Sequence, residues 1–334
     1  SPAAADGARR GRMETSAGTV NAPAISVVMG VCNNAATLRA ALESILSRTG
    51  PALEIIVVDD GSTDGSAAIL DEAAKKEPRL KVVHKKNEGL TRALIDGCAL
   101  ATAPWIARQD ADDVSLPGRL AALLDLARRQ PEAVLLASSA WCVGPKGERL
   151  RLASCTPDPE LARAQVLDLG IGPPAHGSTM FSRAAYEAVG GYRDCFYYGQ
   201  DSDLWMRLAE RGGVAYLAEP FYAYRFGADS ISGGRRSVQK AFGRLGRECR
   251  AARRAGRSEE PALVRLRRLS DQVRRGRRPA TRRGLAQGHY HVGCLLEASD
   301  PAAAADYFRA ALMCDPLAWK ARFKLWRLRR GGRA

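Results

Sequence analysis

Short apolar runs alternate with amphipathic stretches between residues 24 and 143 of the chain. The runs are bounded by turn residues and are too short for buried helices, which is typical of strands covered on both faces. The predicted strands span 25–31, 54–58, 80–84, 105–107 and 133–143. The stretches between them carry apolar residues at helical spacing, which predicts helices at 35–47, 65–76, 89–101 and 116–129. Four successive strand–helix units predict an α/β fold with a Rossmann-like, doubly wound and mainly parallel sheet.

The pattern becomes less regular after residue 145. A Gly-Pro-Lys-Gly turn at 144–147 predicts a hairpin, and Ser182 is expected to cap a helix. The expected helices lie at 158–168, at 183–189 and from about Asp201 onward, and the expected strands lie at 213–217 and 221–226. These elements are expected to complete one domain that ends near residue 234.

Helical periodicity returns beyond residue 235. Apolar side chains recur at helical spacing in two stretches of residues 235–283, which predicts two amphipathic helices. Small residues around Tyr307 and Phe308 resemble one tetratricopeptide-like helix pair, which must pack on the α/β domain or on another subunit because a single repeat is not stable alone. We therefore expect a disordered leader at 1–23, an α/β domain at 24–234, a basic helical segment at 235–283, and a helical pair with a basic tail at 284–334.

Charge is distributed unevenly along the 334 residues. The chain has 51 Lys plus Arg and 36 Asp plus Glu, a formal net charge of +15, which suggests nucleic acid, an anionic membrane or a phosphate-rich ligand. Residues 1–234 carry 25 basic and 28 acidic side chains, residues 235–283 carry 18 and 4, and residues 284–334 carry 8 and 4. The α/β domain is therefore weakly acidic, and the basic character belongs to the C-terminal hundred residues.

Cysteine spacing and hydropathy indicate the compartment. The eight cysteines are scattered, with no two closer than thirteen residues, so the Cys-x-x-Cys pattern of a structural zinc site does not occur. Such cysteines are typical of buried thiols in a reducing compartment. The N-terminal residues lack the apolar core of a secretory signal, and no stretch reaches 18 consecutive apolar residues. We expect a cytoplasmic protein, with peripheral contact at the inner face of the cytoplasmic membrane as an option.

Two acidic clusters lie at the ends of two strands of the predicted sheet. Asp59 and Asp60 end the second strand, and Asp110 and Asp112 end the fourth. In an open α/β sheet the carboxyl ends of the strands meet at one edge, where ligands bind. Turn and helix-cap chemistry is the simpler explanation, and it is sufficient for Asp64. It does not explain why four more carboxylates gather where they repel one another, which instead indicates a divalent cation or a hydroxyl-rich ligand.

Five short motifs follow one another along the α/β domain. They are Val31-Cys-Asn-Asn34, Val57-Val-Asp-Asp-Gly-Ser-Thr-Asp64, Asn87-Glu-Gly-Leu90, Asp110-Ala-Asp-Asp113 and Tyr198-Gly-Gln-Asp-Ser-Asp-Leu-Trp205. In this order they resemble the motifs of family-2 glycosyltransferases of the GT-A fold, over about residues 24–234. The resemblance implies inverting transfer of a sugar from a nucleoside-diphosphate sugar, a UDP-sugar in the first place, to a hydroxyl of a saccharide or lipid-linked acceptor. It further implies a role in the synthesis of a bacterial surface polysaccharide or glycolipid.

The resemblance also implies roles for single residues. Asp201 would be the catalytic base that removes the proton from the acceptor hydroxyl, and Asp112 would bind Mn²⁺ or Mg²⁺. Asp60 would accept hydrogen bonds from the base of the nucleotide and Asp110 from its ribose hydroxyls. The residues implied in nucleotide binding are Val31, Asn33, Asp59, Asp60, Gly61, Asn87, Gly89 and Asp110.

Other residues near these motifs have a functional and an ordinary explanation. The candidates for acceptor or diphosphate contacts are His176, Gln200, Trp205 and Arg225. The alternatives are an ordinary loop histidine for His176 and a surface salt bridge for Arg225. Asp113 either caps the helix at 116–129 or supports Asp112, and Asp203 either has a chemical role or only favours a helix N-terminus.

Two residues depart from the family pattern. Gly227 stands where family members often carry a histidine near the metal, and Gln200 stands where many carry glutamate. Either Asp229 substitutes for the missing histidine, or the metal is held by fewer ligands. The base and the Asp-x-Asp pair are both retained, so we expect an active enzyme.

The arginine-rich segment 235–283 leaves three interpretations open, namely a solvated helical face, contact with an anionic membrane, and nucleic-acid binding. Phe242 is the only aromatic residue of the segment, which disfavours nucleic acid because single strands bind by base stacking. Membrane contact is compatible with a lipid-linked acceptor. The C-terminal helices are also candidates for contact with a second copy or another partner.

Two other functions stay open from the sequence alone. A sugar-phosphate nucleotidyltransferase would need a Gly-rich loop with Lys or Arg after the first strand, and Cys32-Asn33-Asn34 offers none. A non-catalytic nucleotide-sugar-binding or scaffold protein is suggested by Gly227 and by the repeat-like tail.

Overall fold

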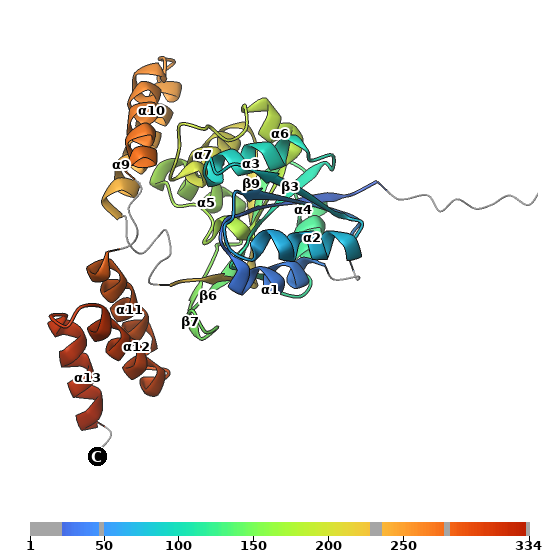
Figure 1. Cartoon of the computed structure of the whole chain (residues 1–334). Helices are drawn as coiled ribbons and strands as arrows, with labels where there is room; N and C mark the ends of the chain where they lie inside the picture. The colour runs from blue at the N-terminus through green and yellow to red at the C-terminus, as the bar shows by residue number, and fades with distance from the viewer. Residues whose placement is uncertain (1–21, 47–49, 228–235, 277–280, 332–334) are drawn as a thin grey trace, which may run out of the picture.

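The computed structural model describes residues 22–46, 50–227, 236–276 and 281–331. In this part of the chain a nine-stranded mixed sheet has the order β3-β2-β1-β4-β8-β6-β9-β5, and β7 pairs with β6. The strands are β1 (Ile25–Val31), β2 (Leu53–Asp60), β3 (Leu80–Lys85), β4 (Trp105–Asp110), β5 (Val114–Ser115), β6 (Ala133–Val143), β7 (Arg149–Ala153), β8 (Thr179–Ser182) and β9 (Gly213–Arg225). Figure 1 shows helices on both faces of the sheet and two further groups of helices beside it.

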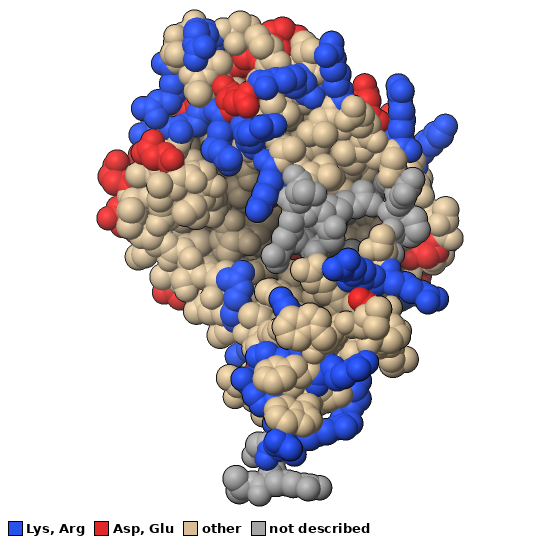
Figure 2. Space-filling view, turned by 90° about the vertical axis from the view of Figure 1, so that its left-hand side faces the viewer, with Lys and Arg blue, Asp and Glu red and all other residues tan. Residues whose placement is uncertain are grey.

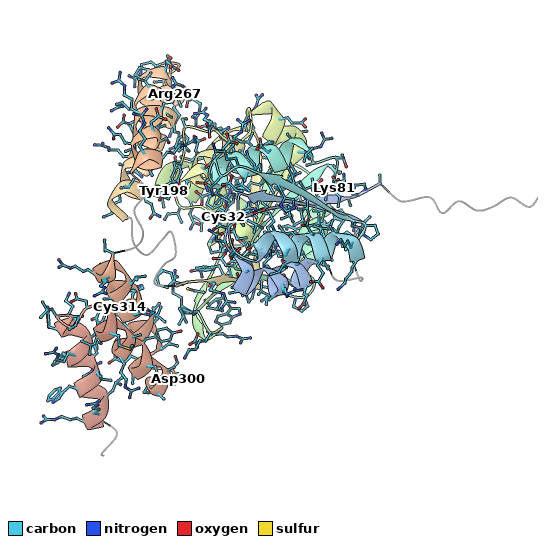
Figure 3. The ribbon with its side chains drawn as sticks, viewed as in Figure 1. Cys32, Lys81, Tyr198, Arg267, Asp300 and Cys314 are labelled. Atoms are coloured by element: carbon cyan, nitrogen blue, oxygen red, sulfur yellow. The ribbon has the colours of Figure 1, made fainter. Side chains whose placement is uncertain are left out.

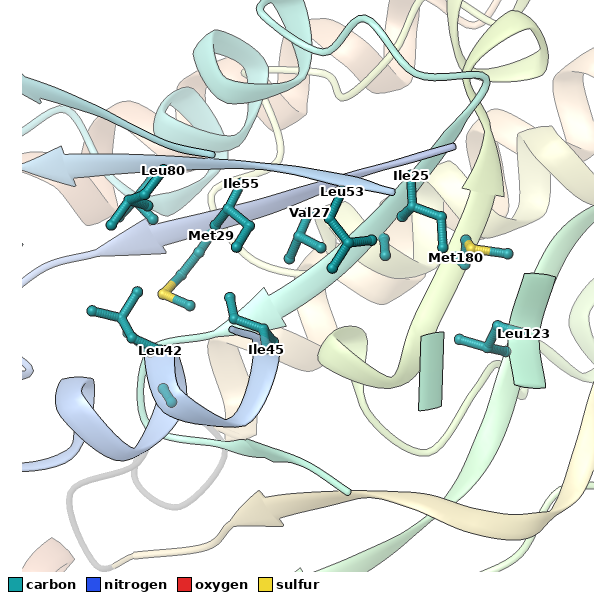
Figure 4. Packing of buried hydrophobic residues seen from close by; sticks show 14 of the residues in the cluster. Ile25, Val27, Met29, Leu42, Ile45, Leu53, Ile55, Leu80, Leu123 and Met180 are labelled. Atoms are coloured by element: carbon teal, nitrogen blue, oxygen red, sulfur yellow. The ribbon is translucent and has the colours of Figure 1, made fainter. Parts of the chain in front are cut away.

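Both faces of the sheet are covered because side chains alternate along the central strands. The helices of the α/β domain are α1 (Ala35–Ile45), α2 (Ser66–Lys76), α3 (Leu90–Ala99), α4 (Arg119–Arg129), α5 (Pro159–Ala164), α6 (Arg183–Ala188) and α7 (Gln200–Arg211). Val27 and Met29 face a core that includes α1, α2 and α4, whereas Val28 faces a core that includes α3 and α7. Figure 4 shows the first of these cores, with Met29 close to Leu42. The predicted doubly wound α/β architecture is confirmed.

Strand ends differ from the sequence prediction in two places. β2 and β4 continue through the acidic residues, so Asp59, Asp60 and Asp110 lie inside strands and not after them. The strands predicted at 213–217 and 221–226 are one strand, β9, and its register against β6 shifts near Pro220. Proline has no N–H to donate to the ladder, so it interrupts the pairing without ending the strand.

Two predicted helix starts can be compared with the structure. Ser182 caps α6 as expected, because its hydroxyl accepts a hydrogen bond of 3.3 Å from Ala185 N. Asp64 lies one residue before the N-cap of α2, and its carboxylate accepts from Ser66 N at 2.9 Å and from Ala35 N at 3.0 Å. Asp64 therefore satisfies donors at the beginning of two helices, which agrees with the simple explanation given for it.

The basic segment forms the two amphipathic helices that were predicted, α9 (Arg236–Arg254) and α10 (Glu260–Arg275). Phe242, Cys249 and Leu266 are buried against Phe196, which precedes α7. Several arginines of this segment form ion pairs with the α/β domain or within the segment. These pairs are Arg253–Glu210, Arg250–Asp168, Arg274–Asp194 and Arg265–Glu248.

The C-terminal helices are α11 (Arg282–Leu296), α12 (Pro301–Cys314) and α13 (Trp319–Gly331), so a third helix joins the predicted pair. A Cβ on Gly293 of α11 would lie 2.7 Å from a ring carbon of Phe308, so glycine permits the close approach of α11 and α12. The group packs on the hairpin of β6 and β7, where Tyr307 Oη donates to Glu148 Oε1 at 2.8 Å. Packing on the α/β domain, one of the two options from the sequence, is therefore observed.

The thiols, the N-terminal residues and the length of the helices were also considered in the sequence. All eight cysteines are free thiols. The predicted leader lies outside the described residues except for its last two positions. Among the described residues, the helices are all too short or too polar to cross a lipid bilayer.

Candidate active site

The carboxyl ends of β1, β2 and β4 lie side by side. Register pairs Val31 of β1 with Asp59 of β2, and Gly30 with Asp110 of β4. Because neighbouring strands are about 4.8 Å apart, the two acidic clusters lie about 10 Å apart on either side of β1. In Figure 3 Cys32, which follows β1, lies at this edge, and Lys81, near the start of β3, lies toward the other end of the sheet. The prediction that both clusters reach one edge is confirmed.

Asn33 joins the loop after β1 to the loop after β2. Its Oδ1 accepts a hydrogen bond of 2.7 Å from Thr63 N, and its own N–H donates to Ser62 Oγ at 3.0 Å. Asn33 has a φ of 58°, in the left-handed region that asparagine tolerates better than most side chains. Asn34 N donates to Ser66 Oγ at 2.9 Å and extends the connection. The two loops therefore form one fixed surface at the edge of the sheet.

Asp60 holds the loop that contains Asn87 and Gly89. Its two carboxylate oxygens accept from Glu88 N at 2.8 Å and from Gly89 N at 2.7 Å, and Asn87 Nδ2 donates to Asp60 O at 2.7 Å. Gly61 has a φ of +70°, and a Cβ there would lie 2.7 Å from Asn87 N, so glycine is required. The structure thus gives Asp60 a positioning role; its carboxylate keeps lone pairs for a nucleotide base, and that contact stays a prediction.

Asp59 faces the opposite side of the sheet from Asp60, because successive residues of a strand alternate. Its Oδ2 lies 2.8 Å from His84 Nδ1 on β3, and its Oδ1 accepts from Ser62 N at 3.1 Å. Hydrogen bonds with Asp59 and Asp71 raise the pKa of His84. The two adjacent aspartates therefore hold different parts of the site. Asp59 holds the turn after β2 and contacts β3, whereas Asp60 holds the 87–89 loop.

Asp110 is the accessible end of a buried ion pair. Arg108 Nη2 lies 2.5 Å from Asp110 Oδ1; the arginine side chain is fully buried, whereas 24% of the Asp110 side chain is exposed. Tyr222 Oη accepts from Asp110 N at 3.1 Å. These contacts fix the carboxylate at the end of β4 and leave part of it open to solvent.

Arg225 at the end of β9 secures the loop that carries Asp112 and Asp113. Its N–H donates to Asp113 Oδ1 at 2.7 Å, while its guanidinium donates to Asp112 O at 3.0 Å and to Pro145 O at 2.7 Å. Burial, together with the charges of Asp110 and Asp112, raises the pKa of Asp113 well above its usual range. Asp113 supports its neighbour and does not cap α4, whose N-cap is Gly118. For Arg225 a diphosphate contact stays a prediction.

The acidic loop fits a divalent cation that binds together with a diphosphate. Among the described residues, no group of three His, Cys, Asp or Glu side chains is arranged to hold a metal. Mg²⁺ bound with a phosphate substrate needs only one or two carboxylates from the protein. Asp112 and Asp110 are the candidates for such a pair, and their charges add to the effect of burial in raising the pKa of Asp113. Gly227, where a histidine was expected, is buried, and Asp229 lies outside the described residues.

Asp201 lies in the first turn of α7, and its Oδ1 accepts from Ser202 N at 2.7 Å. Burial raises the pKa of Asp201, and the charge of Asp110 adds to this effect. Its hydrogen bond with Ser202 fixes Asp201 at the beginning of α7. Asp203 differs, because it is buried in an ion pair of 2.6 Å with Arg207. Asp203 therefore stabilises α7 through an ion pair, whereas the role of Asp201 as the base stays a prediction.

The remaining acceptor candidates lie deeper than the sequence suggests. His176 Nε2 is 2.6 Å from Tyr192 Oη, and the His176 ring lies edge-on to Trp205 with 6.0 Å between the ring centres. Burial lowers the pKa of His176 well below its usual range. Gln200 is buried, and only 4% of Trp205 is exposed. A Cβ on Gly172 would lie 2.2 Å from the Trp205 ring. Within the described residues, the buried indole N–H of Trp205 has no acceptor.

Sequence reasoning missed Arg119, which lies beneath the acidic loop. Its guanidinium is buried and donates to Ser115 Oγ at 2.7 Å and to Arg108 O at 2.6 Å, and it lies 4.8 Å from the centre of the Tyr222 ring. Burial lowers the pKa of Arg119 to about 10. One signal was present, because Arg119 falls on the buried stripe of α4 with Leu123.

Comparison with known proteins decides the family. Residues 26–190 match the family model described as glycosyl transferase family 2. Over 216 residues the chain is 33% identical to "Putative glycosyltransferase EpsE" of Bacillus subtilis (strain 168). The matched residues make up 63% of this chain and 75% of EpsE. The chain belongs to glycosyltransferase family 2. The chain is therefore a glycosyltransferase. This result favours the first interpretation of the sequence over the two alternatives, a nucleotidyltransferase and a non-catalytic scaffold.

Solved structures support the fold of this family-2 glycosyltransferase. TarS residues 1–349 of S. aureus in complex with UDP gives a TM-score of 0.53 at 14% identity, covering 91% of this chain and 88% of that one. The mannosyltransferase PcManGT from Pyrobaculum calidifontis in complex with GDP-Man and Mn²⁺ gives 0.52 at 18% identity, covering 92% and 84%. The expected GT-A fold is confirmed.

Proposed function

We propose that this family-2 glycosyltransferase transfers a sugar from a nucleoside-diphosphate sugar to an acceptor hydroxyl with inversion at the anomeric carbon. The observation that carries the proposal is the arrangement around β1, where the two acidic clusters flank one strand end. A nucleotide held by the first cluster would place its diphosphate beside the second. We propose a UDP-sugar as the donor and a saccharide or lipid-linked hydroxyl as the acceptor.

The nucleoside would bind on the fixed surface formed by the loops after β1, β2 and β3. The residues proposed to contact it are Val31, Asn33, Asp59, Asp60, Gly61, Asn87, Gly89 and Asp110. Their loops are held by hydrogen bonds of 2.7–3.1 Å within the protein itself. Such preorganisation reduces the conformational entropy lost on binding. Asp110 keeps exposed carboxylate surface for the ribose hydroxyls.

Asp112, with Asp110 beside it, would hold Mn²⁺ or Mg²⁺ together with the diphosphate. The bound ion would supply neutralisation of the negative charge on the departing nucleoside diphosphate. Arg225 and Asp113 would keep Asp112 in place through the hydrogen bonds that join β9 to the acidic loop. The structure of PcManGT contains Mn²⁺, but at 18% identity it supports the fold of this chain and not the choice of metal.

Asp201 would act as the general base. Its carboxylate would take the proton of the acceptor hydroxyl while the acceptor oxygen forms a bond to the anomeric carbon, and the bond from that carbon to the diphosphate oxygen would break. One displacement of this kind inverts the carbon and needs no covalent enzyme intermediate. Burial raises the pKa of Asp201 and so makes its carboxylate a stronger base.

A thermal-shift screen with nucleotide sugars tests the donor and the metal. Ligand binding raises the melting temperature by mass action, so the preferred donor should give the largest shift, and EDTA should remove it. The variant Asp112→Asn should lose the metal-dependent part of the shift. Asp125→Asn on the exposed face of α4 is the matched control and should behave as the wild type. The proposal fails if UDP-sugars and GDP-sugars give no shift either with or without Mn²⁺.

A further inference from the structure

Helix α13 has apolar side chains on two opposite faces. Ala321 and Leu325 are buried in the core that α13 shares with α11 and α12. Trp319, Phe323 and Trp326 remain 69%, 52% and 47% exposed. Their spacing of four and three residues places the three rings side by side on one face of the helix, away from the bundle. The packing of the C-terminal helices therefore uses one face and leaves the aromatic face uncovered.

The aromatic face, defined as Trp319, Phe323 and Trp326, continues onto the turn before the helix. Leu317 in this turn and Met313 in the last turn of α12 are each 85% exposed. Single exposed apolar residues are ordinary on a protein surface, but three exposed rings on one face of a helix are typical of an interaction site. Figure 2 shows uncharged surface on the lower lobe surrounded by Lys and Arg side chains.

Cations surround the aromatic face. Residues 319–331 contain six Lys or Arg and no Asp or Glu. Lys320 Nζ lies 5.6 Å from the centre of the Trp319 ring, and the Arg330 guanidinium lies 4.2 Å from that of Trp326. Lys324 and Arg327 are paired with Glu297 of α11, on the side of α13 toward the bundle. The exposed rings therefore have a positive border.

The chemistry of this surface selects its occupant. A second copy bound through the same face would bring Lys and Arg against Lys and Arg, because a two-fold contact pairs a patch with itself. Nucleic-acid bases need open ring faces to stack on, but Phe323 and Trp326 are stacked on each other and Arg330 covers Trp326. An apolar helical face with tryptophan and a basic border is suited to the interface of an anionic bilayer, where indole rings lie among the headgroups.

We propose that the aromatic face of α13 docks the enzyme on an anionic lipid bilayer. The rings enter the boundary between headgroups and acyl chains, and Lys320, Arg329 and Arg330 lie on the lipid phosphates. This location differs from the one considered from the sequence, segment 235–283. Several arginines of α9 and α10 form ion pairs within the protein, as Arg253 does with Glu210. The inference does not depend on the donor or on the acceptor.

Co-sedimentation of the full chain with vesicles tests the proposal. Vesicles of phosphatidylcholine with about one third phosphatidylglycerol should pellet the protein, and pure phosphatidylcholine should pellet much less. The triple variant Trp319→Ala, Phe323→Ala, Trp326→Ala should lower the partition coefficient at least about tenfold. Leu100→Ala with Leu161→Ala, two exposed leucines of the α/β domain, is the control and should keep wild-type binding.

A second pair of variants tests how much the cations beside the aromatic face contribute to vesicle binding. Lys320→Gln with Arg330→Gln should lower binding to anionic vesicles by about fivefold for each charge removed. Arg128→Gln with Arg129→Gln removes the same charge from α4 and should change little. Indole fluorescence should be quenched by vesicles with brominated acyl chains in the wild type and much less in the triple variant. All these residues are exposed, so thermal unfolding should match the wild type and verify folding.

Three results would overturn the proposal. The first is that the triple variant binds anionic vesicles as strongly as the wild type does. The second is an absence of vesicle binding together with concentration-dependent dimerisation that the triple variant abolishes, which would assign the face to a second copy. The third is an absence of vesicle binding together with oligonucleotide binding that the triple variant loses.

Discussion

Arg225 and Asp113 join the end of β9 to the acidic loop through a hydrogen bond of 2.7 Å from the arginine main chain to the buried carboxylate. The guanidinium of the same arginine then donates to Asp112 O at 3.0 Å. The proposed metal ligand is therefore held by a residue 113 positions later in the chain. Arg225 can therefore position the acidic loop through its own hydrogen bonds, whether or not it also contacts the diphosphate.

Replacing Arg225 by methionine should weaken the site without unfolding the domain. The main-chain bond to Asp113 remains, but three carbonyl acceptors lose a donor, and the loop that carries Asp112 is less well fixed. We expect the KM for the donor to rise about tenfold and the unfolding free energy to fall by about 1–3 kcal/mol. Steady-state kinetics and denaturant unfolding measure the two effects. Arg211→Met, at the exposed end of α7, is the control, and an unchanged KM would contradict the positioning role.

Asp201 and Asp203 should respond differently to the same change. Asp201→Asn removes the proposed base, so kcat should fall at least about 100-fold while the donor-induced thermal shift stays as in the wild type. Asp203→Asn weakens a buried ion pair with Arg207 and should lower the melting temperature instead. Sugar transfer and thermal unfolding, measured on both variants, separate the roles. Transfer that survives in Asp201→Asn would require another base.

The sequence predicts the architecture of this domain well because the signals are local. Apolar runs such as Ile25–Val31 indicate buried strands, and their alternation with helices leaves few topologies. The shared edge of Asp59 and Asp110 also follows, because parallel strands end on the same side. Ser182 could be recognised as a cap from its position alone.

The contacts that fix the site could not be predicted, because they join residues far apart in the chain. The bonds from Asp60 to the 87–89 loop and from Arg225 to the acidic loop depend on strand register and on how β9 passes β6. Burial also changed the interpretation of polar residues. His176 is next to Tyr192 and Trp205, a placement that no spacing rule indicates.

Glu54 should make stability depend on acidic pH. Burial alone would raise the pKa of this carboxylate, but hydrogen bonds from Lys81, Ser26 and Thr102 outweigh it and lower the pKa to about 2. A lowered pKa means that the stabilisation is complete above the ordinary value near 4.5 and is lost as the pH falls toward 2. Glu54→Gln should cost about 3 kcal/mol at pH 7.

The difference between Glu54→Gln and the wild type should shrink below about pH 4. Urea unfolding at pH 7, 5 and 3.5 measures it. Glu132→Gln, on an exposed turn before β6, is the matched control and should show no such trend. A constant difference at all three values would mean that the charge of Glu54 is not what stabilises the fold.

Arg119 should be the most costly single replacement near the site. Its buried guanidinium donates to the carbonyl of Arg108, to Ser115 Oγ and to the carbonyl of Gly177, so it joins β4, α4 and the loop before β8. Arg119→Leu retains the apolar stem but leaves those acceptors buried without a donor, and we expect a loss of about 3–5 kcal/mol. Arg128→Leu on the exposed face of the same helix should change the unfolding free energy by less than about 0.5 kcal/mol. Denaturant unfolding compares them, and equal stabilities would show that water satisfies the acceptors that Arg119 now occupies.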